Sequence, residues 1–117
     1  MTALGLALLS VLALGAPASA ATYSFRCTPQ VYPQVCGKAF AVPSGKSVWV
    51  NFKSSGYMAG FKAYNKDGDH YLGKTEAAYS GNVRLWFNNT NRTIRVQVRA
   101  SVLVGGNGAV SGTYWVG

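Results

Sequence analysis

The side chains that could perform acid–base chemistry lie close together in one short stretch. His70 is the only histidine, and the acids are Asp67, Asp69 and Glu76. A Ser-His-Asp catalytic triad would need His70 as its base. Successive residues of a strand point to opposite faces, so Asp69 would be separated from His70. A glycosidase needs two carboxylates across a cleft, whereas these acids are neighbours in sequence. We therefore expect no catalytic residue and a protein that is not an enzyme.

The same stretch resembles the spacing of a calcium-binding loop. Its alternating oxygen ligands would be Asn65, Asp67, Asp69 and, further along, Glu76. An EF-hand loop needs Gly at its sixth position, where this chain has His70, and we expect no flanking helix. A tight hairpin at 67–68 explains the same residues, because Gly accepts the positive φ of a type I′ turn. A single His and two Cys also fall short of a zinc site, so we expect no metal and no cofactor.

A third set of residues combines aromatic rings with positive charge. These rings alternate with apolar residues, which places them on the opposite faces of the expected strands, together with basic side chains. Exposed rings of this kind stack on sugars or on the bases of single-stranded nucleic acid, although no specific nucleic-acid motif is present. The alternative is a structural role, for example in cation–π pairs. The candidate binding residues are Trp49, Tyr64, Arg84, Trp86, Arg95 and Arg99.

The formal net charge is +8, with 11 Lys and Arg against 3 acids. Such a field attracts anionic polymers, which include acidic polysaccharides, teichoic acids, nucleic acids and anionic membranes. The alternative is that the charge only keeps the protein soluble. A polysaccharide or another anionic polymer is therefore the expected partner.

Residues 1–20 have the features of a signal peptide. The segment 3–15 is small, apolar and uncharged, and Ala18-Ser19-Ala20 fits a signal peptidase site. The apolar run is shorter than the roughly 20 residues of a membrane-spanning helix. No Lys or Arg precedes it, so either the start codon lies upstream of Met1 or the signal is weak. We expect a secreted protein with one domain over residues 21–117 and no transmembrane segment in that domain.

Two cysteines, Cys27 and Cys36, remain in the mature chain. An even number in an exported protein predicts one disulfide. Closing so short a loop stabilises a fold by roughly 2.5–3 kcal/mol in the chain-entropy treatment. Pro29 and Pro33 restrict the loop further.

Period-two alternation predicts short strands at 22–27, 39–42, 47–53, 59–65, 69–72, 83–88, 94–104 and 110–116. Seven to eight such strands, separated by turn residues, indicate an all-β fold, an antiparallel β-sandwich or a small barrel. Two Asn-x-Thr sequons, at 88–90 and 91–93, are expected to form a turn rather than glycosylation sites, because the Ala- and Leu-rich start suggests a bacterial protein. The expected core is Phe25, Val48, Val50, Phe52, Phe61, Val83, Leu85, Phe87, Ile94, Val96 and Val98.

Three segments carry a resemblance to a known family. They are a strand, Pro-x-Gly turn and strand at 40–50, a strand ending in Asp-Gly at 61–68, and Gly112-Thr113-Tyr114. With these segments, residues 37–117 resemble the prepeptidase C-terminal (PPC) β-sandwich domains of secreted bacterial proteins. The resemblance implies an accessory binding or export module. Most acidic residues of that family are missing here, so it does not imply calcium.

These patterns together predict a secreted, non-enzymatic domain that binds an anionic or carbohydrate polymer of the cell envelope or environment. The alternative is a secreted antimicrobial effector or an inhibitor of a hydrolase. In that alternative, the loop between Cys27 and Cys36 would supply the contacting residues.

Overall fold

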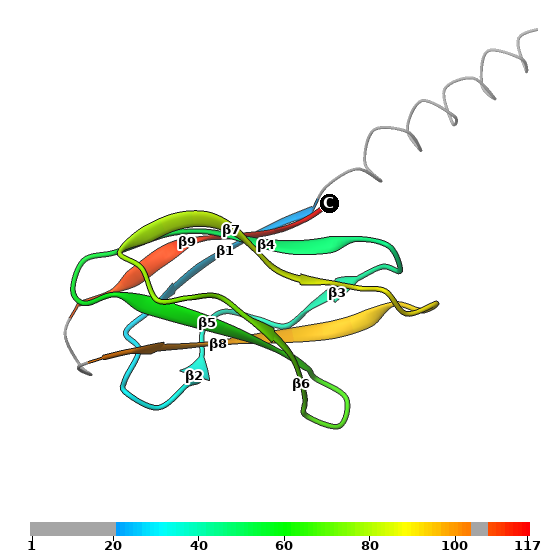
Figure 1. The fold of residues 1–117 in the computed structure, drawn as a ribbon, viewed down its shortest axis with the longest axis horizontal. Helices are drawn as coiled ribbons and strands as arrows, with labels where there is room; N and C mark the ends of the chain where they lie inside the picture. The colour runs from blue at the N-terminus through cyan, green and yellow to red at the C-terminus, as the bar shows by residue number, and fades with distance from the viewer. Residues whose placement is uncertain (1–20, 104–107) are drawn as a thin grey trace, which may run out of the picture.

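A computed structural model describes residues 21–103 and 108–117. This part of the chain forms nine strands and no helix, arranged as two antiparallel sheets that face each other as a β-sandwich (Figure 1). The predicted fold class is therefore confirmed. The expected signal peptide and the Gly-rich residues 104–107 lie outside the described residues.

Among the residues described, no helix is long and apolar enough to cross a membrane.

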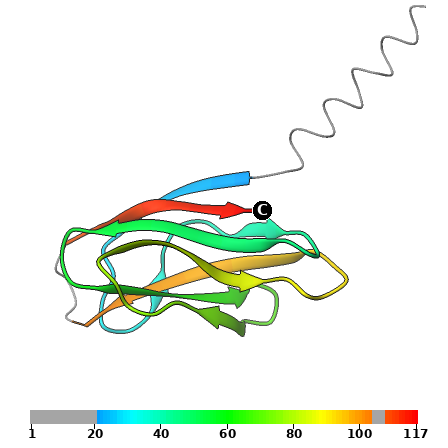
Figure 2. The same cartoon turned by 45° about the horizontal axis from the view of Figure 1, so that its top comes forward.

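The first sheet, sheet A, has the strand order β1-β9-β4-β7. Its strands are β1 (Ala21–Cys27), β9 (Val110–Val116), β4 (Ser47–Ser54) and β7 (Ser80–Phe87). In Figure 2, β9 lies between β1 and β4, so the end of the chain is held in the middle of the sheet. Sheet A therefore joins distant parts of the sequence into one surface.

The second sheet, sheet B, has the order β2-β8-β5-β6, and β3 pairs with β8 beside β2. Its strands are β2 (Gln34–Val35), β3 (Phe40–Val42), β5 (Ala59–Asn65), β6 (His70–Lys74) and β8 (Ile94–Val102). The chain crosses repeatedly between the two sheets, so the outer face of each sheet is formed by strands that are distant in sequence.

The core follows the predicted alternation with two exceptions. Nearly all the predicted core residues are buried, but Val83 and Phe87 are 39% and 43% exposed, so their prediction is wrong. The pairing of β4 with β7 shifts register between Val48 and Trp49, which leaves Leu85 without a direct partner and breaks the alternation. Val83 lies on the edge strand of sheet A, beside a cleft of about 330 Å³.

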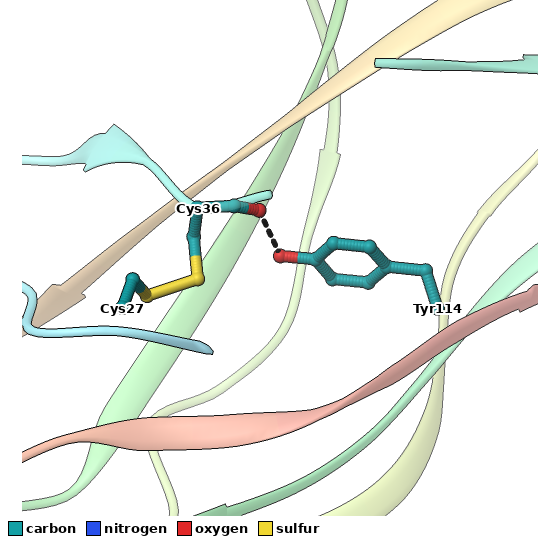
Figure 3. Close-up of a disulfide and its surroundings, with 3 residues drawn as sticks. All are labelled: Cys27, Cys36 and Tyr114. Carbon is teal, nitrogen blue, oxygen red and sulfur yellow. Dashed lines mark hydrogen bonds between the residues drawn. A yellow bond between two sulfur atoms is a disulfide. The ribbon is translucent and has the colours of Figure 1, made fainter. Parts of the chain in front are cut away.

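The predicted disulfide between Cys27 and Cys36 is present. Figure 3 shows Tyr114 reaching from β9 to the same place, where its hydroxyl donates a hydrogen bond of 2.6 Å to the carbonyl of Cys36. The ring of Tyr114 stacks on Phe25, with ring centroids 4.2 Å apart. The covalent bridge and the buried tyrosine together fix the end of the disulfide loop against the core.

The hairpin between β5 and β6 is longer than the predicted two-residue turn. Asn65 pairs with His70, so residues 66–69 form the loop. Gly68 and Asp69 both have positive φ, at 91° and 57°. Asp69 therefore belongs to the turn and not to the returning strand, because a left-handed residue cannot continue a strand.

Candidate functional site

The outer face of sheet A is polar apart from one pair of indoles and the ring of Phe87, which is 43% exposed and lies 5.9 Å from the guanidinium carbon of Arg84. Strand register places Trp115 of β9 directly opposite Trp49 of β4, with Thr22 of β1 and Arg84 of β7 at the two ends of this row. The next two rows carry hydroxyl, amide and basic side chains. They are Ser24, Thr113, Asn51 and Asn82, followed by Arg26, Ser111, Lys53 and Ser80.

The two indoles, named here the indole pair, stack nearly parallel. The ring centroids of Trp49 and Trp115 are 5.2 Å apart, and the ring planes differ by 9°. The indole nitrogen of Trp115 donates a hydrogen bond of 3.4 Å to the side-chain oxygen of Asn82, which orients the ring across β4 toward β7. Both rings are half-buried. Each ring therefore has one face turned away from its partner, in a row that ends at Thr22 and Arg84.

The structure does not bring the predicted binding residues together on one face. Trp49 and Arg84 lie opposite each other on the outer face of sheet A. Tyr64, Arg95 and Arg99 are carried by β5 and β8 of sheet B, on the other side of the sandwich. Their neighbours in those strands, such as Ala63, Val96 and Val98, face the core.

Trp86 belongs to neither outer face. It lies opposite Val48, which is fully buried, and packs against the core. A methyl group on Gly73 of β6 would lie 3.5 Å from the Trp86 side chain, so this ring bridges the edges of the two sheets. The register shift in β7 is the cause, because strict alternation would have put Trp86 on the same face as Arg84.

On sheet B, Arg99 is engaged with the protein itself. Its guanidinium carbon lies 4.0 Å from the ring centroid of Tyr64, and its Nε donates a hydrogen bond of 3.0 Å to the side-chain oxygen of Gln97. A terminal nitrogen also forms an ion pair with Asp69. These contacts order the hairpin loop against β8, so Arg99 and Tyr64 stabilise the outer face of sheet B.

The acids and the single histidine do not assemble into a catalytic or metal-binding group. Asp69 pairs with Arg99, and the side-chain oxygen of Asn65 accepts a hydrogen bond from the backbone N–H of Asp67. His70 is exposed at the start of β6. Within residues 21–103 and 108–117, no three His, Cys, Asp or Glu side chains come close enough together to hold a metal ion.

Sequence reasoning missed Trp115, the second ring of the indole pair. The signal was present, because Trp115 lies between Tyr114 and Val116, and both of these are buried. Alternation therefore places Trp115 on the outer face. Alternation does not predict that β9 pairs with β4, because no local pattern specifies the strand order.

The disulfide loop forms a second exposed feature. Tyr32 at its tip is 80% exposed, and Val31 and Val35 are each 53% exposed. The base of the loop is fixed against the rest of the protein. Pro29 is buried, and the backbone N–H of Val102 donates a hydrogen bond of 3.0 Å to the carbonyl of Gln30. The loop therefore presents apolar side chains from a restrained backbone.

No family model and no curated protein matches this chain. A solved structure with a similar chain is titled "Structure of infectious bursal disease virus Gx strain", with a TM-score of 0.38 and 16% sequence identity. The match covers 84% of this chain and 31% of that one. Function therefore has to be inferred from the side chains on the two outer faces and the disulfide loop.

Proposed function

We propose that this chain is an exported, non-enzymatic module that binds a carbohydrate polymer through the outer face of sheet A. The observation that carries the proposal is the indole pair, Trp49 and Trp115, set in a surface of hydroxyl and amide side chains. An aromatic ring offers a flat apolar surface for the C–H face of a sugar, and neighbouring polar groups fix the orientation of its hydroxyls.

The geometry of the three rows suits an extended chain rather than a single small molecule. Adjacent strands lie about 4.8 Å apart, so the four strands of sheet A offer a surface of roughly 15 Å across. Polar groups from all four strands flank the indole pair. Thr113 and Asn51 face each other beside the rings, and Asn82 already orients one of them. A polymer lying across the strands would meet these groups in succession.

A binding assay on insoluble polysaccharides tests this proposal. The substitutions Trp49→Ala and Trp115→Ala should each weaken retention on the bound polysaccharide by about tenfold or more, since buried aromatic contacts dominate binding energies. The matched control is Tyr71→Ala, which removes an aromatic side chain that is 53% exposed on sheet B. If chitin, cellulose and peptidoglycan all fail to retain the protein, or the indole variants bind as well as Tyr71→Ala, the proposal is wrong.

Export is a separate part of the proposal. The disulfide between Cys27 and Cys36 supports it, because such bonds persist in oxidising compartments. The mature protein should then begin at Ala21, as the cleavage pattern before it predicts. Amino-terminal sequencing of protein recovered from the culture medium checks this, and an intact residue 1 in that fraction would contradict it.

The exposed disulfide loop favours a second candidate function, inhibition of a hydrolase or a toxic effect on a competitor. A loop restrained by a disulfide loses little conformational entropy on binding, and Tyr32 projects from its tip. Tyr32→Ala should abolish inhibition in a panel of proteases and glycan hydrolases, and should abolish growth inhibition, without weakening retention on polysaccharide. If the unaltered protein inhibits no enzyme of the panel and no growth, this candidate is excluded.

A further inference from the structure

Three basic side chains form a row across the outer face of sheet B. Lys62 of β5 lies directly opposite Arg99 of β8 on one side and directly opposite Lys74 of β6 on the other. Like charges in such positions destabilise a sheet. Asp69 offsets Arg99, but in the described part of the chain neither Lys62 nor Lys74 forms an ion pair with a carboxylate. Two lysines are therefore placed side by side without a carboxylate at ion-pair distance.

The same two lysines line a cleft of about 350 Å³. Its floor includes Gly60, and the segment after β6 passes over this glycine, with the carbonyl of Thr75 3.7 Å from where a Cβ would lie. Ser101 and Leu103 close the cleft from the end of β8. Its volume is in the range of sites that hold a small ligand or one unit of a polymer. We call this cleft, with Lys62 and Lys74, the sheet B cleft.

The lining of the sheet B cleft matches a sugar unit better than a bare anion. Glu76 lines it together with the lysines, and a carboxylate repels phosphate or sulfate but accepts hydrogen bonds from sugar hydroxyls. Val31, Met58 and Leu103 add apolar surface for C–H groups. The one aromatic residue of the lining, Phe61, is fully buried. Nucleotide binding by stacking would need an accessible ring.

We propose that the sheet B cleft binds an acidic sugar unit, with Lys62 and Lys74 on its carboxylate and Glu76 on its hydroxyls. The two ammonium groups would share the anionic group, which removes the repulsion between them and forms charge-assisted hydrogen bonds. The hydroxyls of Thr75 and Ser101 lie in the same lining and supply further polar contacts. This site goes beyond the binding proposed for sheet A and stands without it, because it shares no residue with the indole pair.

Calorimetric titration with tri-galacturonate tests the site, with a neutral trisaccharide and inorganic sulfate as comparison ligands. The double variant Lys62→Gln with Lys74→Gln should bind tri-galacturonate about tenfold or more weakly, since hydrogen bonds to charged groups are lost. The control is Lys38→Gln with Lys66→Gln, which removes the same charge from two exposed lysines outside the cleft and outside the rows of sheet A. That control should change the affinity by less than about twofold, because solvent-exposed charges are screened by salt.

Two further readouts separate this site from general electrostatic attraction. Glu76→Gln should weaken tri-galacturonate binding while leaving or improving the weak binding of sulfate. The lysine double variant should melt at the same or a higher temperature than the unaltered protein, because a like-charge contact is relieved. Equal losses in the two lysine double variants, or sulfate binding as tightly as tri-galacturonate, would overturn the proposal. Retention through the indole pair would be unaffected by either result.

Discussion

At the scale of single residues, one buried amide holds the turn between β7 and β8. Asn88 is fully buried, and its amide nitrogen donates hydrogen bonds of 2.9 Å to the carbonyls of Val42 and Arg92. Its side-chain oxygen accepts from the backbone N–H and the hydroxyl of Thr90. The sequon at 88–90 is therefore part of the turn, as predicted, and its asparagine is fully engaged inside the protein.

We expect Asn88→Ala to lower the free energy of unfolding by about 2–3 kcal/mol, because it leaves a buried carbonyl without a donor. Urea denaturation measures the change. The control, Asn89→Ala, alters an exposed neighbour and should stay within about 0.5 kcal/mol. An Asn88→Ala protein as stable as this control would show that the hydrogen bonds of the turn contribute little.

Tyr114 gives the protein a pH dependence in the alkaline range. Burial raises the pKa of its hydroxyl above the ordinary value, so the folded protein keeps the neutral form. The unfolded chain ionises near pH 10. The stabilisation is therefore complete below about pH 10 and falls as the pH rises above it, by up to about 1.4 kcal/mol per pH unit.

The substitution Tyr114→Phe removes both the titrating group and the hydrogen bond to Cys36. Near neutral pH it should cost about 1–2 kcal/mol. Above pH 10 the difference from the unaltered protein should shrink, because only the tyrosine protein loses stability by ionisation. Urea midpoints measured for both proteins from pH 7 to pH 11 would check this. A constant difference across that range would contradict it.

At the scale of elements, the contact between β4 and β9 depends on a glycine. A Cβ at Gly112 would lie 1.9 Å from the carbonyl oxygen of Asn51, and this neighbour is backbone that cannot rotate away. Gly112→Ala should therefore separate the two central strands of sheet A and cost more than about 2 kcal/mol in unfolding free energy. Gly60→Ala is the control, since a Cβ there meets only ordinary contacts, the nearest at 3.7 Å. Similar stability of the two alanine variants would refute this explanation.

Alternation predicted the strands well because both sheets bury one face and expose the other. Phe52, Phe61 and Val98 are buried as expected. A register shift of one residue would move all the apolar side chains of a strand from the core to solvent, so the apolar pattern fixes which face is buried. The rule failed in β7, where the register shift turned Trp86 toward the core and exposed Phe87. A bulge depends on the partner strand, and at the bulge β7 pairs with residues 35 to 38 positions away in β4, so no local pattern marks it.

The candidate sites were less predictable than the strands for the same reason. Alternation correctly set Trp49, Arg84 and Lys62 on outward faces. Whether two outward residues share a sheet depends on the strand order, and the chain's repeated crossings sent Tyr64 and Trp49 to opposite sides. The basic row of sheet B exists only through cross-strand register, which joins residues 62, 74 and 99.

At the scale of the whole molecule, positive charge is spread over both outer faces. Arg26, Lys53 and Arg84 lie on the rows of sheet A, while Lys62 and Lys74 lie on sheet B. The net charge of +8 should thus attract polyanions from either side, and this attraction should weaken as salt shortens the screening length. Contacts with the uncharged indole pair should not depend on the salt concentration in this way. Salt should therefore weaken binding in the sheet B cleft more than binding on sheet A.

The two binding proposals together predict that one molecule holds two glycan chains, because the indole pair and the sheet B cleft lie on opposite sheets. Packed sheets lie about 10 Å apart and their outer side chains point in opposite directions, so a ligand on the indole pair and a ligand in the sheet B cleft approach from different sides. Protein captured on an insoluble neutral polysaccharide should therefore retain labelled oligogalacturonate. The variant Lys62→Gln with Lys74→Gln should be captured normally and retain no label.

The outcome depends on whether the two faces are independent. Trp49→Ala with Trp115→Ala should bind oligogalacturonate in solution with unchanged affinity, although the polysaccharide no longer captures it, because distant sites without shared contacts behave additively. Release of captured protein on addition of oligogalacturonate would instead show that both glycans compete for one surface. Binding of two glycans at once requires that each ligand leaves the other in place. Competition would arise at the edge between β6 and β7, where Lys74 and Glu76 of the sheet B cleft line a further cleft together with Arg84 of sheet A.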